Sequence, residues 1–179
     1  KLEEKGLAEA KEAVDLGRLI NEAIGQSRRI ARGLFPVKLE AEGLSSALQE
    51  LADTVSAHAR VACRFETNCV ELVFDAGVSS NVYRLAQEAV HNALKHGEPP
   101  SISIGLYRRD PEFELVVLND GKMFARGPGP RAGMGLRIME HRAQTIGGQC
   151  SIGPGPNGGT AVRCTAPLKS KISDAGERV

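Results

Sequence analysis

Residues 84–97 read RLAQEAVHNALKHG and give the strongest indication of this chain's architecture. Apolar side chains recur around them at spacings of three and four residues, which predicts the buried stripe of a helix: Val82, Leu85, Ala86, Ala89 and Ala93. Glu88 and Asn92 lie one helical turn apart, and Lys95 and His96 follow on a neighbouring face. Such an edge can serve a phosphate and a hard metal ion. An ordinary amphipathic helix with a solvated polar face would show the same pattern.

A second informative segment, Gly133-Met134-Gly135-Leu136, lies further along the chain. It follows the glycine- and proline-rich residues 122–132 and precedes apolar positions at helical spacing. Glycines at the start of a helix let backbone N–H groups close on an anion, and the helix N-terminus adds partial positive charge. A GxG pattern alone is weak, but its place between a loop and a helix favours a phosphate site. We expect residues 122–132 to form a lid over a nucleotide; the alternative is an ordinary flexible loop.

Four motifs in order resemble the ATP-binding catalytic domain of a bacterial sensor histidine kinase, in the superfamily shared with gyrase, mismatch-repair and heat-shock-chaperone ATPases. Residues 87–96 match the form QEAxxNAxKH, and residues 117–123 match a strand followed by DxGxG imperfectly. Residues 133–136 match GxGL, and residues 158–160 match GGT. The resemblance extends over nearly the whole chain. It points more narrowly to kinases that pair with response regulators carrying a helix-turn-helix output domain.

The adenine-binding motif departs from the family's pattern at two positions. Asn119 stands where the family has an acid that accepts a hydrogen bond from adenine, and an amide oxygen can still accept that bond. Met123 replaces the second glycine, which predicts crowding where the backbone would approach the nucleotide. Choosing Asp120 as the adenine partner would break the Asp-x-Gly spacing, so we favour Asn119. The alternative is that Asn119-Asp120-Gly121 forms only a tight turn.

The resemblance also implies roles for individual residues. Glu88 and Lys95 are the expected catalytic residues, and Asn92 is expected to hold Mg²⁺ through ATP. The expected ATP-binding residues are Asn92, His96, Asn119, Gly121, Gly133, Gly135, Leu136 and Thr160.

The order of periodic segments predicts an α+β fold, a two-layer sandwich with helices on one face of a mixed β-sheet. Helices are expected around residues 44–55, over 78–96 and after Gly135, the last through Leu136, Ile138, Met139, Ala143 and Ile146. Strands are expected at 61–66, around 72–74, at 101–107 and 113–118, and as a hairpin of 149–152 with 160–166. A turn is expected at Arg109-Asp110-Pro111.

An N-terminal coiled-coil-like helix is predicted over residues 13–34, where apolar positions alternate at three and four residues until Pro36 ends it. It either packs on its own domain or, as the resemblance implies, forms the second helix of a dimerisation and phosphoacceptor hairpin. The predicted divisions are 1–36 for this partial hairpin, 37–168 for the ATP-binding catalytic domain and 169–179 for a flexible tail. No histidine precedes His58, so the acceptor is expected upstream of this sequence.

Composition narrows the function classes. The net charge is +1 with both signs mixed along the chain, which gives no support for nucleic-acid binding. No apolar run is long enough for a membrane span, so we expect a cytoplasmic segment without membrane contact, with any membrane anchor elsewhere. The four cysteines lack a CxxC pair, so we expect reduced thiols and no zinc.

The resemblance implies an ATP-dependent protein-histidine kinase of a two-component system, which transfers the γ-phosphoryl group of MgATP to the upstream histidine. Its implied partners are the phosphoacceptor hairpin, a second copy in a homodimer and a cognate response regulator. Two alternatives remain. Asn119 and Met123 would suit a nucleotide-binding module without transferase activity, and Glu88 activating water would suit a hydrolytic ATPase of the same superfamily.

Overall fold

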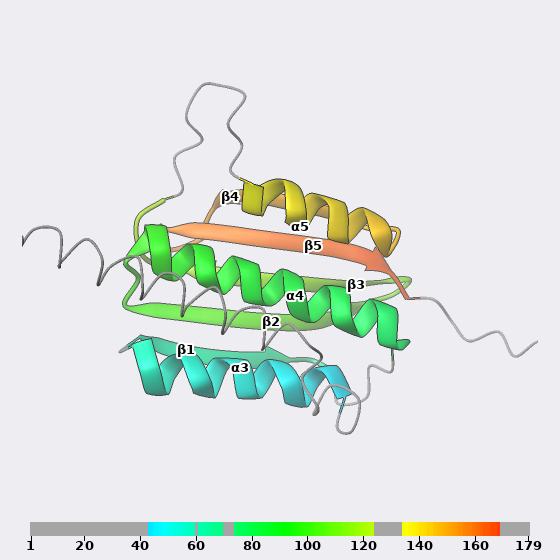
Figure 1. Ribbon diagram of the computed structural model, residues 1–179, viewed down its shortest axis with the longest axis horizontal. Helices are drawn as coiled ribbons and strands as arrows, with labels where there is room; N and C mark the ends of the chain where they lie inside the picture. The colour runs from blue at the N-terminus through cyan, green and yellow to red at the C-terminus, as the bar shows by residue number, and fades with distance from the viewer. Residues whose placement is uncertain (1–42, 60, 70–73, 124–133, 169–179) are drawn as a thin grey trace, which may run out of the picture. The chain divides into compact units, whose positions relative to one another are not determined.

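The computed structural model describes residues 43–59, 61–69, 74–123 and 134–168. The described residues form a five-stranded sheet, and Figure 1 shows the helices packed on it, running roughly along the strands. The elements are α3 (Gly43–Ala59), β1 (Ala62–Thr67), α4 (Ala76–Asn92), the π-helical turn η2 (Ala93–Gly97), β2 (Ser101–Arg109), β3 (Glu112–Asn119), α5 (Met134–Thr145), β4 (Gln149–Pro154) and β5 (Thr160–Pro167).

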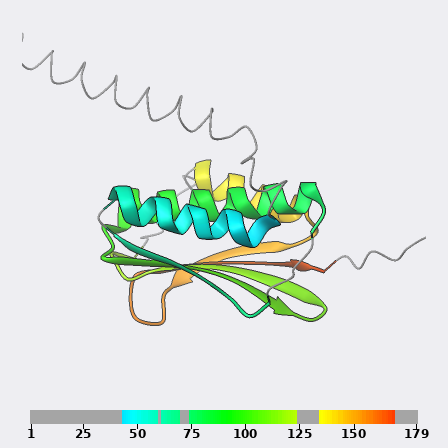
Figure 2. The same cartoon turned by 90° about the horizontal axis from the view of Figure 1, so that it is seen from below.

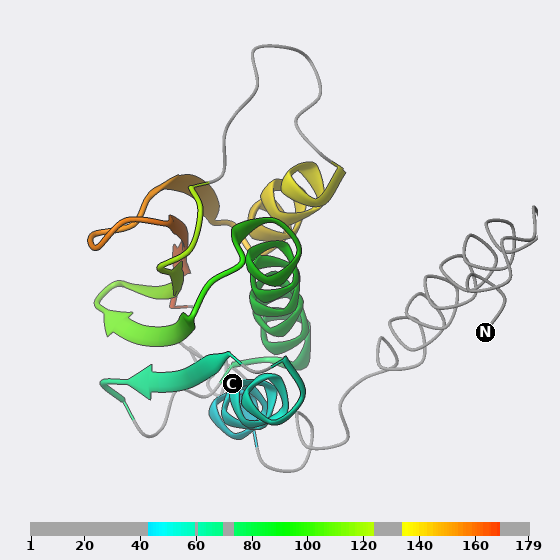
Figure 3. The ribbon, with the colours of Figure 1, turned by 90° about the vertical axis from the view of Figure 1, so that its left-hand side faces the viewer.

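The sheet is mixed and carries its helices on one face. Its strand order is β1-β2-β3-β5-β4, in which β1 and β2 are parallel and the other neighbours antiparallel. Figures 2 and 3 show α3, α4 and α5 in one layer on the same face of the sheet. The predicted α+β architecture is therefore confirmed.

Helix α4 forms where the apolar stripe predicted it. Asp75 caps its N-terminus by accepting a hydrogen bond from the Val78 backbone N–H at 2.8 Å. The predicted stripe is buried, and its members Val82 and Ala86 are fully so. The observed ending differs from the prediction of one helix through residue 96, because the last residues widen into the π-helical turn η2 and Glu98 then adopts a left-handed backbone with φ 46°.

Strands β2 and β3 supply most of the core on the sheet side. Ile102, Ile104 and Leu106 alternate along β2 and are each 0% exposed. Burying a side chain of this kind contributes roughly 1.5–3 kcal/mol. Phe113 is buried at the start of β3, and Phe74 meets it edge-on with ring centroids 4.6 Å apart. Phe74 is not in a strand, and the rest of the strand predicted around residues 72–74 lies outside the described residues.

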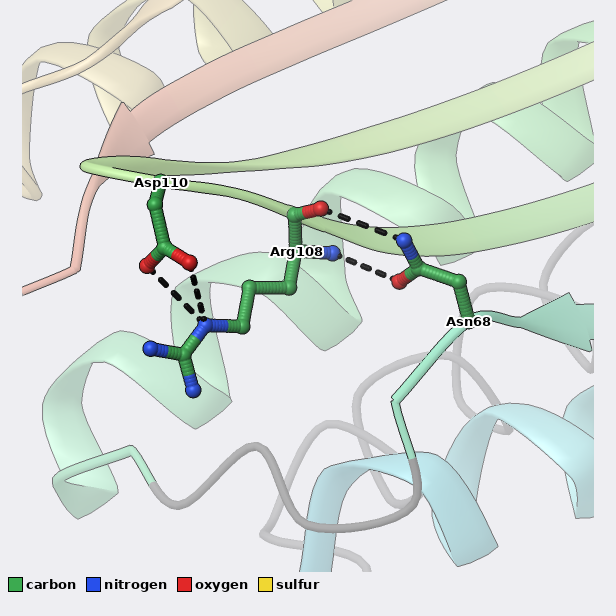
Figure 4. Close-up of polar contacts among 3 residues, drawn as sticks. All are labelled: Asn68, Arg108 and Asp110. Carbon is green, nitrogen blue, oxygen red and sulfur yellow. Dashed lines mark hydrogen bonds and ion pairs between the residues drawn. The ribbon is translucent and has the colours of Figure 1, made fainter.

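A side-chain amide prolongs the pairing of β1 with β2 (Figure 4). Asn68 follows β1, donates from Nδ2 to the Arg108 carbonyl oxygen at 3.2 Å and accepts from the Arg108 backbone N–H at 2.8 Å. The Arg108 guanidinium in turn contacts both carboxylate oxygens of Asp110, with Nε–O distances of 2.9 and 3.0 Å. These contacts support the predicted turn between β2 and β3 at Asp110-Pro111.

Several predicted features lie outside the described residues. These are the coiled-coil-like helix with Pro36, most of the lid, Gly133 and the tail from residue 169. The predicted divisions 1–36, 37–168 and 169–179 therefore stay predictions.

Within the described ranges, no helix combines the length and apolar character that crossing a bilayer requires.

Candidate functional site

A cavity of about 290 Å³ opens between α4, η2, the start of α5 and the strands β3, β5 and β4. Its apolar lining comes from both layers: Ala89, Ala93, Val117, Leu136, Met139, Ile152 and Val162. Its polar lining is concentrated on α4, η2 and the strand ends: Glu88, His91, Asn92, Lys95, His96, Asn119, Lys122 and Thr160. An apolar slot with a few convergent polar groups is the usual form of a small-molecule site.

Glu88 and Asn92 form one polar wall of this cavity. Asn92 donates from Nδ2 to Glu88 Oε1 at 3.2 Å, and both side chains are half-buried. Since the Asn92 NH₂ group is engaged by the carboxylate, its amide oxygen is the atom left to meet a ligand. A merely solvated helix face would not be covered by a second helix and a sheet in this way.

The π-helical turn η2 forms the rim of the cavity. Lys95 and His96 both line the cavity and are exposed, whereas Gly97 is buried. Turns of this kind interrupt a helix at a cost in hydrogen-bond geometry and are frequent at functional sites. The wide turn brings the amine, the imidazole and the buried glycine to the same opening.

Asn119 is the polar group at the base of the cavity. It is 8% exposed, donates from Nδ2 to the Thr160 carbonyl oxygen at 3.4 Å and accepts at Oδ1 from the Gly121 backbone N–H at 3.2 Å. An amide oxygen has two lone pairs, so Oδ1 keeps capacity for one more donor. The NH₂ group is turned toward Thr160.

Asp120 faces away from the cavity. Its carboxylate accepts from the Ser101 backbone N–H at 2.8 Å and from the Ser101 hydroxyl at 2.7 Å. These hydrogen bonds lower the pKa of the Asp120 carboxyl below its ordinary value. Asp120 thus ties the end of β3 to the start of β2, and of the two neighbours only Asn119 lines the cavity.

Gly121 and Met123 do not line the cavity. A Cβ on Gly121 would meet the Gly97 carbonyl oxygen and lie 2.8 Å from the Gly97 carbonyl carbon, so the glycine lets the end of β3 pack on η2. The Lys122 backbone N–H donates to the same Gly97 oxygen at 2.7 Å. Met123 is 61% exposed and does not crowd the cavity as its sequence position suggested.

The start of α5 closes the cavity beside Glu88. A Cβ on Gly135 would collide with Glu88 Oε1 and lie 3.3 Å from Asn92 Nδ2, so a larger residue fits here only if the Glu88 carboxylate moves. Leu136 lines the cavity and is 6% exposed. Gly133 lies outside the described residues.

The contact of α5 with α4 also involves a half-buried guanidinium. Arg142 donates to Asn81 Oδ1 at 3.2 Å, and burial, followed by the neighbouring Arg84, lowers the Arg142 pKa while Glu88 opposes the shift. An arginine stays charged under such a shift. Arg142 therefore contributes a fixed positive charge close to the Glu88 wall.

The polar side chains that line the cavity suit a metal ion that is held mainly by a bound ligand. In the ranges that the structure describes, no group of three or more His, Cys, Asp and Glu side chains could hold an ion alone. Mg²⁺ takes one or two protein oxygens and fills its remaining positions from water and substrate phosphates. The Asn92 amide oxygen beside Glu88 fits that requirement.

The sequence predicted most of the polar residues that line the cavity but not all of its lining. Missing from the prediction were the apolar lining of β3, β4 and β5 and the exposed Lys122, whose Nζ lies 2.6 Å from Glu98 Oε2. Period-two alternation marks Ile152 and Val162 as facing the helices. That they reach this cavity depends on β5 lying between β3 and β4, which no local pattern encodes.

Comparison with known proteins identifies the family to which this chain is similar. The family model described as "Histidine kinase-, DNA gyrase B-, and HSP90-like ATPase" matches residues 77–170. The chain is 27% identical to the signal transduction histidine-protein kinase/phosphatase DegS of Brevibacillus brevis over 169 residues, covering 94% of this chain and 44% of DegS. It is 26% identical to the sensor histidine kinase LiaS of Bacillus subtilis over 160 residues, covering 89% of this chain and 44% of LiaS. The chain therefore spans less than half the length of these curated relatives.

Solved structures share the fold at lower identity. The ATP-binding domain of PrrB from Mycobacterium tuberculosis superposes with a TM-score of 0.56 at 21% identity, covering 71% of this chain and 95% of that one. The histidine kinase domain of the blue-light-activated kinase of Erythrobacter litoralis EL346 gives a TM-score of 0.57 at 22% identity, covering 70% of this chain and 65% of that one.

Proposed function

This chain belongs to the family of histidine kinase-, DNA gyrase B- and HSP90-like ATPases, and we propose that it binds MgATP and passes the γ-phosphoryl group to a histidine upstream of this sequence. The family predicted from the four motifs is confirmed, and it is an ATP-binding family. The transfer to a histidine and the roles of single residues are our proposal.

The observation that carries the proposal is the cavity with Glu88 and Asn92 on one wall and Asn119 at its base. The apolar lining suits the two faces of an adenine ring, and the free lone pair of Asn119 suits the adenine amino group. Thr160 supports Asn119 from β5, and Leu136 adds apolar surface. Gly121 contributes by holding the end of β3 against η2.

The phosphates would extend toward η2 and the start of α5. Lys95 at the rim supplies positive charge, His96 beside it supplies a ring nitrogen for hydrogen bonding, and the backbone N–H groups at the start of α5, next to Gly135, supply further donors. The residues that would hold Mg²⁺ are Asn92, through its amide oxygen, and Glu88, which keeps that amide oriented. When bound, Mg²⁺ neutralises charge on the phosphates.

Phosphoryl transfer asks the protein for positioning and charge neutralisation. Asn119 fixes the base, Lys95 and the glycine amides fix the phosphate end, and Glu88 keeps the Asn92 oxygen directed into the cavity. A rigid wall of this kind leaves the γ-phosphoryl group presented at the open rim. Glu88 orients Asn92 through Oε1. Steady phosphate release by the isolated chain would instead favour the alternative in which Glu88 activates water for hydrolysis.

The proposal includes partners beyond the chain. We infer a phosphoacceptor hairpin upstream, a homodimer partner and a response regulator with a helix-turn-helix output domain, all acting in the cytoplasm. The similarity to DegS and LiaS, whose names describe a histidine kinase/phosphatase and a sensor histidine kinase, supports this two-component assignment.

The test is a titration of the 179-residue chain with a fluorescent ATP analogue, with and without Mg²⁺. Asn92→Ala should lose most of the gain in affinity that Mg²⁺ gives, while its far-ultraviolet circular dichroism stays unchanged. Asn157 is an exposed asparagine of the β4–β5 turn, so Asn157→Ala is the matched control and should bind the analogue as the wild type does. An equal loss for Asn92→Ala with and without Mg²⁺ would contradict the assignment of Asn92.

A further inference from the structure

Two cysteines lie side by side on neighbouring strands, away from the polar wall of the cavity. Cys150 of the edge strand β4 is paired directly with Cys164 of β5, and their Sγ atoms are 2.7 Å apart. Cys164 is 3% exposed and belongs to the core, and Cys150 is half-buried at the sheet edge. The two thiols are therefore neighbours in register as well as in space.

We propose that Cys150 and Cys164 are a reversible oxidation site that closes into a cross-strand disulfide when the chain meets glutathione disulfide. The Cys150 thiolate attacks one sulfur of glutathione disulfide, forming a Cys150–glutathione mixed disulfide and releasing one glutathione thiolate. Cys164 then gives up its proton and attacks Cys150 Sγ, forming the Cys150–Cys164 bond and releasing the second glutathione. The two protein thiols are oxidised and glutathione disulfide is reduced to two glutathione molecules.

The register of the strands permits this bond. Directly opposed residues of antiparallel strands have Cα atoms about 4.5–5.5 Å apart, inside the range of about 4.4–6.8 Å that disulfides span. Both side chains lie on the helix-facing side, because Cys164 is in the core and its partner in register points the same way. The bond therefore forms without moving either strand to a new register.

The two sulfurs differ in the way that the first step needs. Cys150 is the accessible one, and the hydrogen bond from Cys164 lowers its pKa, which favours the attacking thiolate. The same hydrogen bond and burial raise the pKa of Cys164, so Cys150 and not Cys164 supplies the thiolate of the first step.

The two other cysteines are poor competitors. Cys63 lies on β1, at the opposite edge of the sheet, and burial raises its pKa to about 11. Cys69 follows β1 at that same edge. Neither can reach the β4–β5 pair, so oxidation of the folded chain is directed to Cys150 and Cys164.

The disulfide would link β4 to β5 beside the nucleotide cavity without closing the cavity. Ile152 and Val162, the next same-face pair along the two strands, line the cavity and are themselves paired in register. A link one step away ties edge strand β4 to β5 and leaves both apolar side chains in place. The oxidised chain should therefore keep its nucleotide affinity.

The experiment treats the folded 179-residue chain with glutathione disulfide and counts free thiols. The wild type should fall from four to two free thiols, and dithiothreitol should restore four. Because Arg163 separates the two cysteines, trypsin should release peptides 143–163 and 164–169 joined by a disulfide. Cys164→Ser should instead accumulate the mixed disulfide on Cys150, since the resolving thiol is gone.

Two further variants complete the design. Cys150→Ser should keep three free thiols, and the matched control Cys69→Ser should fall from three to one. A disulfide that includes Cys63 or Cys69, or a wild type that stops at the mixed disulfide, would overturn the proposed pair. A loss of affinity for the fluorescent ATP analogue on oxidation, reversed by dithiothreitol, would overturn the inference that the bond spares the cavity.

Discussion

Replacing Gly135 by alanine should weaken nucleotide binding while leaving the stability of the fold nearly unchanged. The new Cβ would collide with Glu88 Oε1, so the carboxylate must swing away and release the Asn92 amide that it holds at 3.2 Å. The Gly135 backbone N–H remains, so the change acts through the wall and not through the loss of an amide. The Glu88 carboxylate is the end of a flexible side chain, which allows this movement without disturbing the core.

The size of the effect follows from the bond that is lost. A hydrogen bond to a charged group contributes about 1.5–3 kcal/mol, and the lower end suits this half-buried pair at 3.2 Å, which corresponds to an affinity for MgATP that is about tenfold weaker. Stability should hardly change, because alanine in the first turn of a helix gains up to about 1 kcal/mol over glycine and offsets the lost contact. The midpoint of thermal unfolding should then move by no more than about 4 °C.

The assay is a titration with the fluorescent ATP analogue in Mg²⁺, together with thermal unfolding of the same sample. Gly153→Ala is the matched control, since a Cβ there meets no atom within 4 Å although the residue lies on β4 near the cavity. Gly153→Ala should bind normally. Wild-type affinity for Gly135→Ala would refute the argument that Glu88 and Asn92 act as one wall, and a large fall in its unfolding temperature would show that the glycine serves the fold.

Two more predictions concern the end of β3. With Asn119 Oδ1 as the acceptor for the adenine amino group, ATP should bind roughly tenfold or more tightly than GTP, because an unpaired buried polar group costs about 1–3 kcal/mol; equal affinities in a competition titration would place the base elsewhere. Asp120 has a lowered pKa, so its bonds to Ser101 stabilise the fold above its unfolded pKa of about 3.9 and this contribution is lost as the pH falls through the lower folded value. Asp120→Ala should therefore lower the urea midpoint at pH 7, and this deficit should shrink as the pH falls from about 3.9 to the lowest pH at which the wild type stays folded. A deficit that stays constant over that range would contradict this.

Much of the fold could be predicted from local patterns. The period of two along β3 even decides between Asn119 and Asp120, since Phe113, Leu115, Val117 and Asn119 fall on one face and Asp120 on the other. The apolar stripe likewise located α4. Each of these predictions depends on a periodicity that neighbouring residues carry among themselves.

The remaining features depend on contacts between distant segments. The π-helical turn at residues 93–97 is held where Gly97 packs under Gly121 and beside Asn119, which no helical pattern reveals. The need for glycine at position 135 comes from Glu88 on another helix. The motifs marked Gly121 and Gly135 as candidates for nucleotide contact, and the structure gives each of these two glycines a packing role as well.

Phosphotransfer between separate polypeptides tests whether this domain is a histidine kinase. The 179-residue chain is incubated with labelled MgATP, alone and with a separate hairpin that carries the upstream phosphoacceptor histidine. We expect no acid-labile phosphate on the chain alone, label on the hairpin in the mixture, and slower labelling by Lys95→Ala than by the control Gly153→Ala. Label on His58, His91, His96 or His141 of the chain, or an unlabelled hairpin despite measured MgATP binding, would contradict the proposed function.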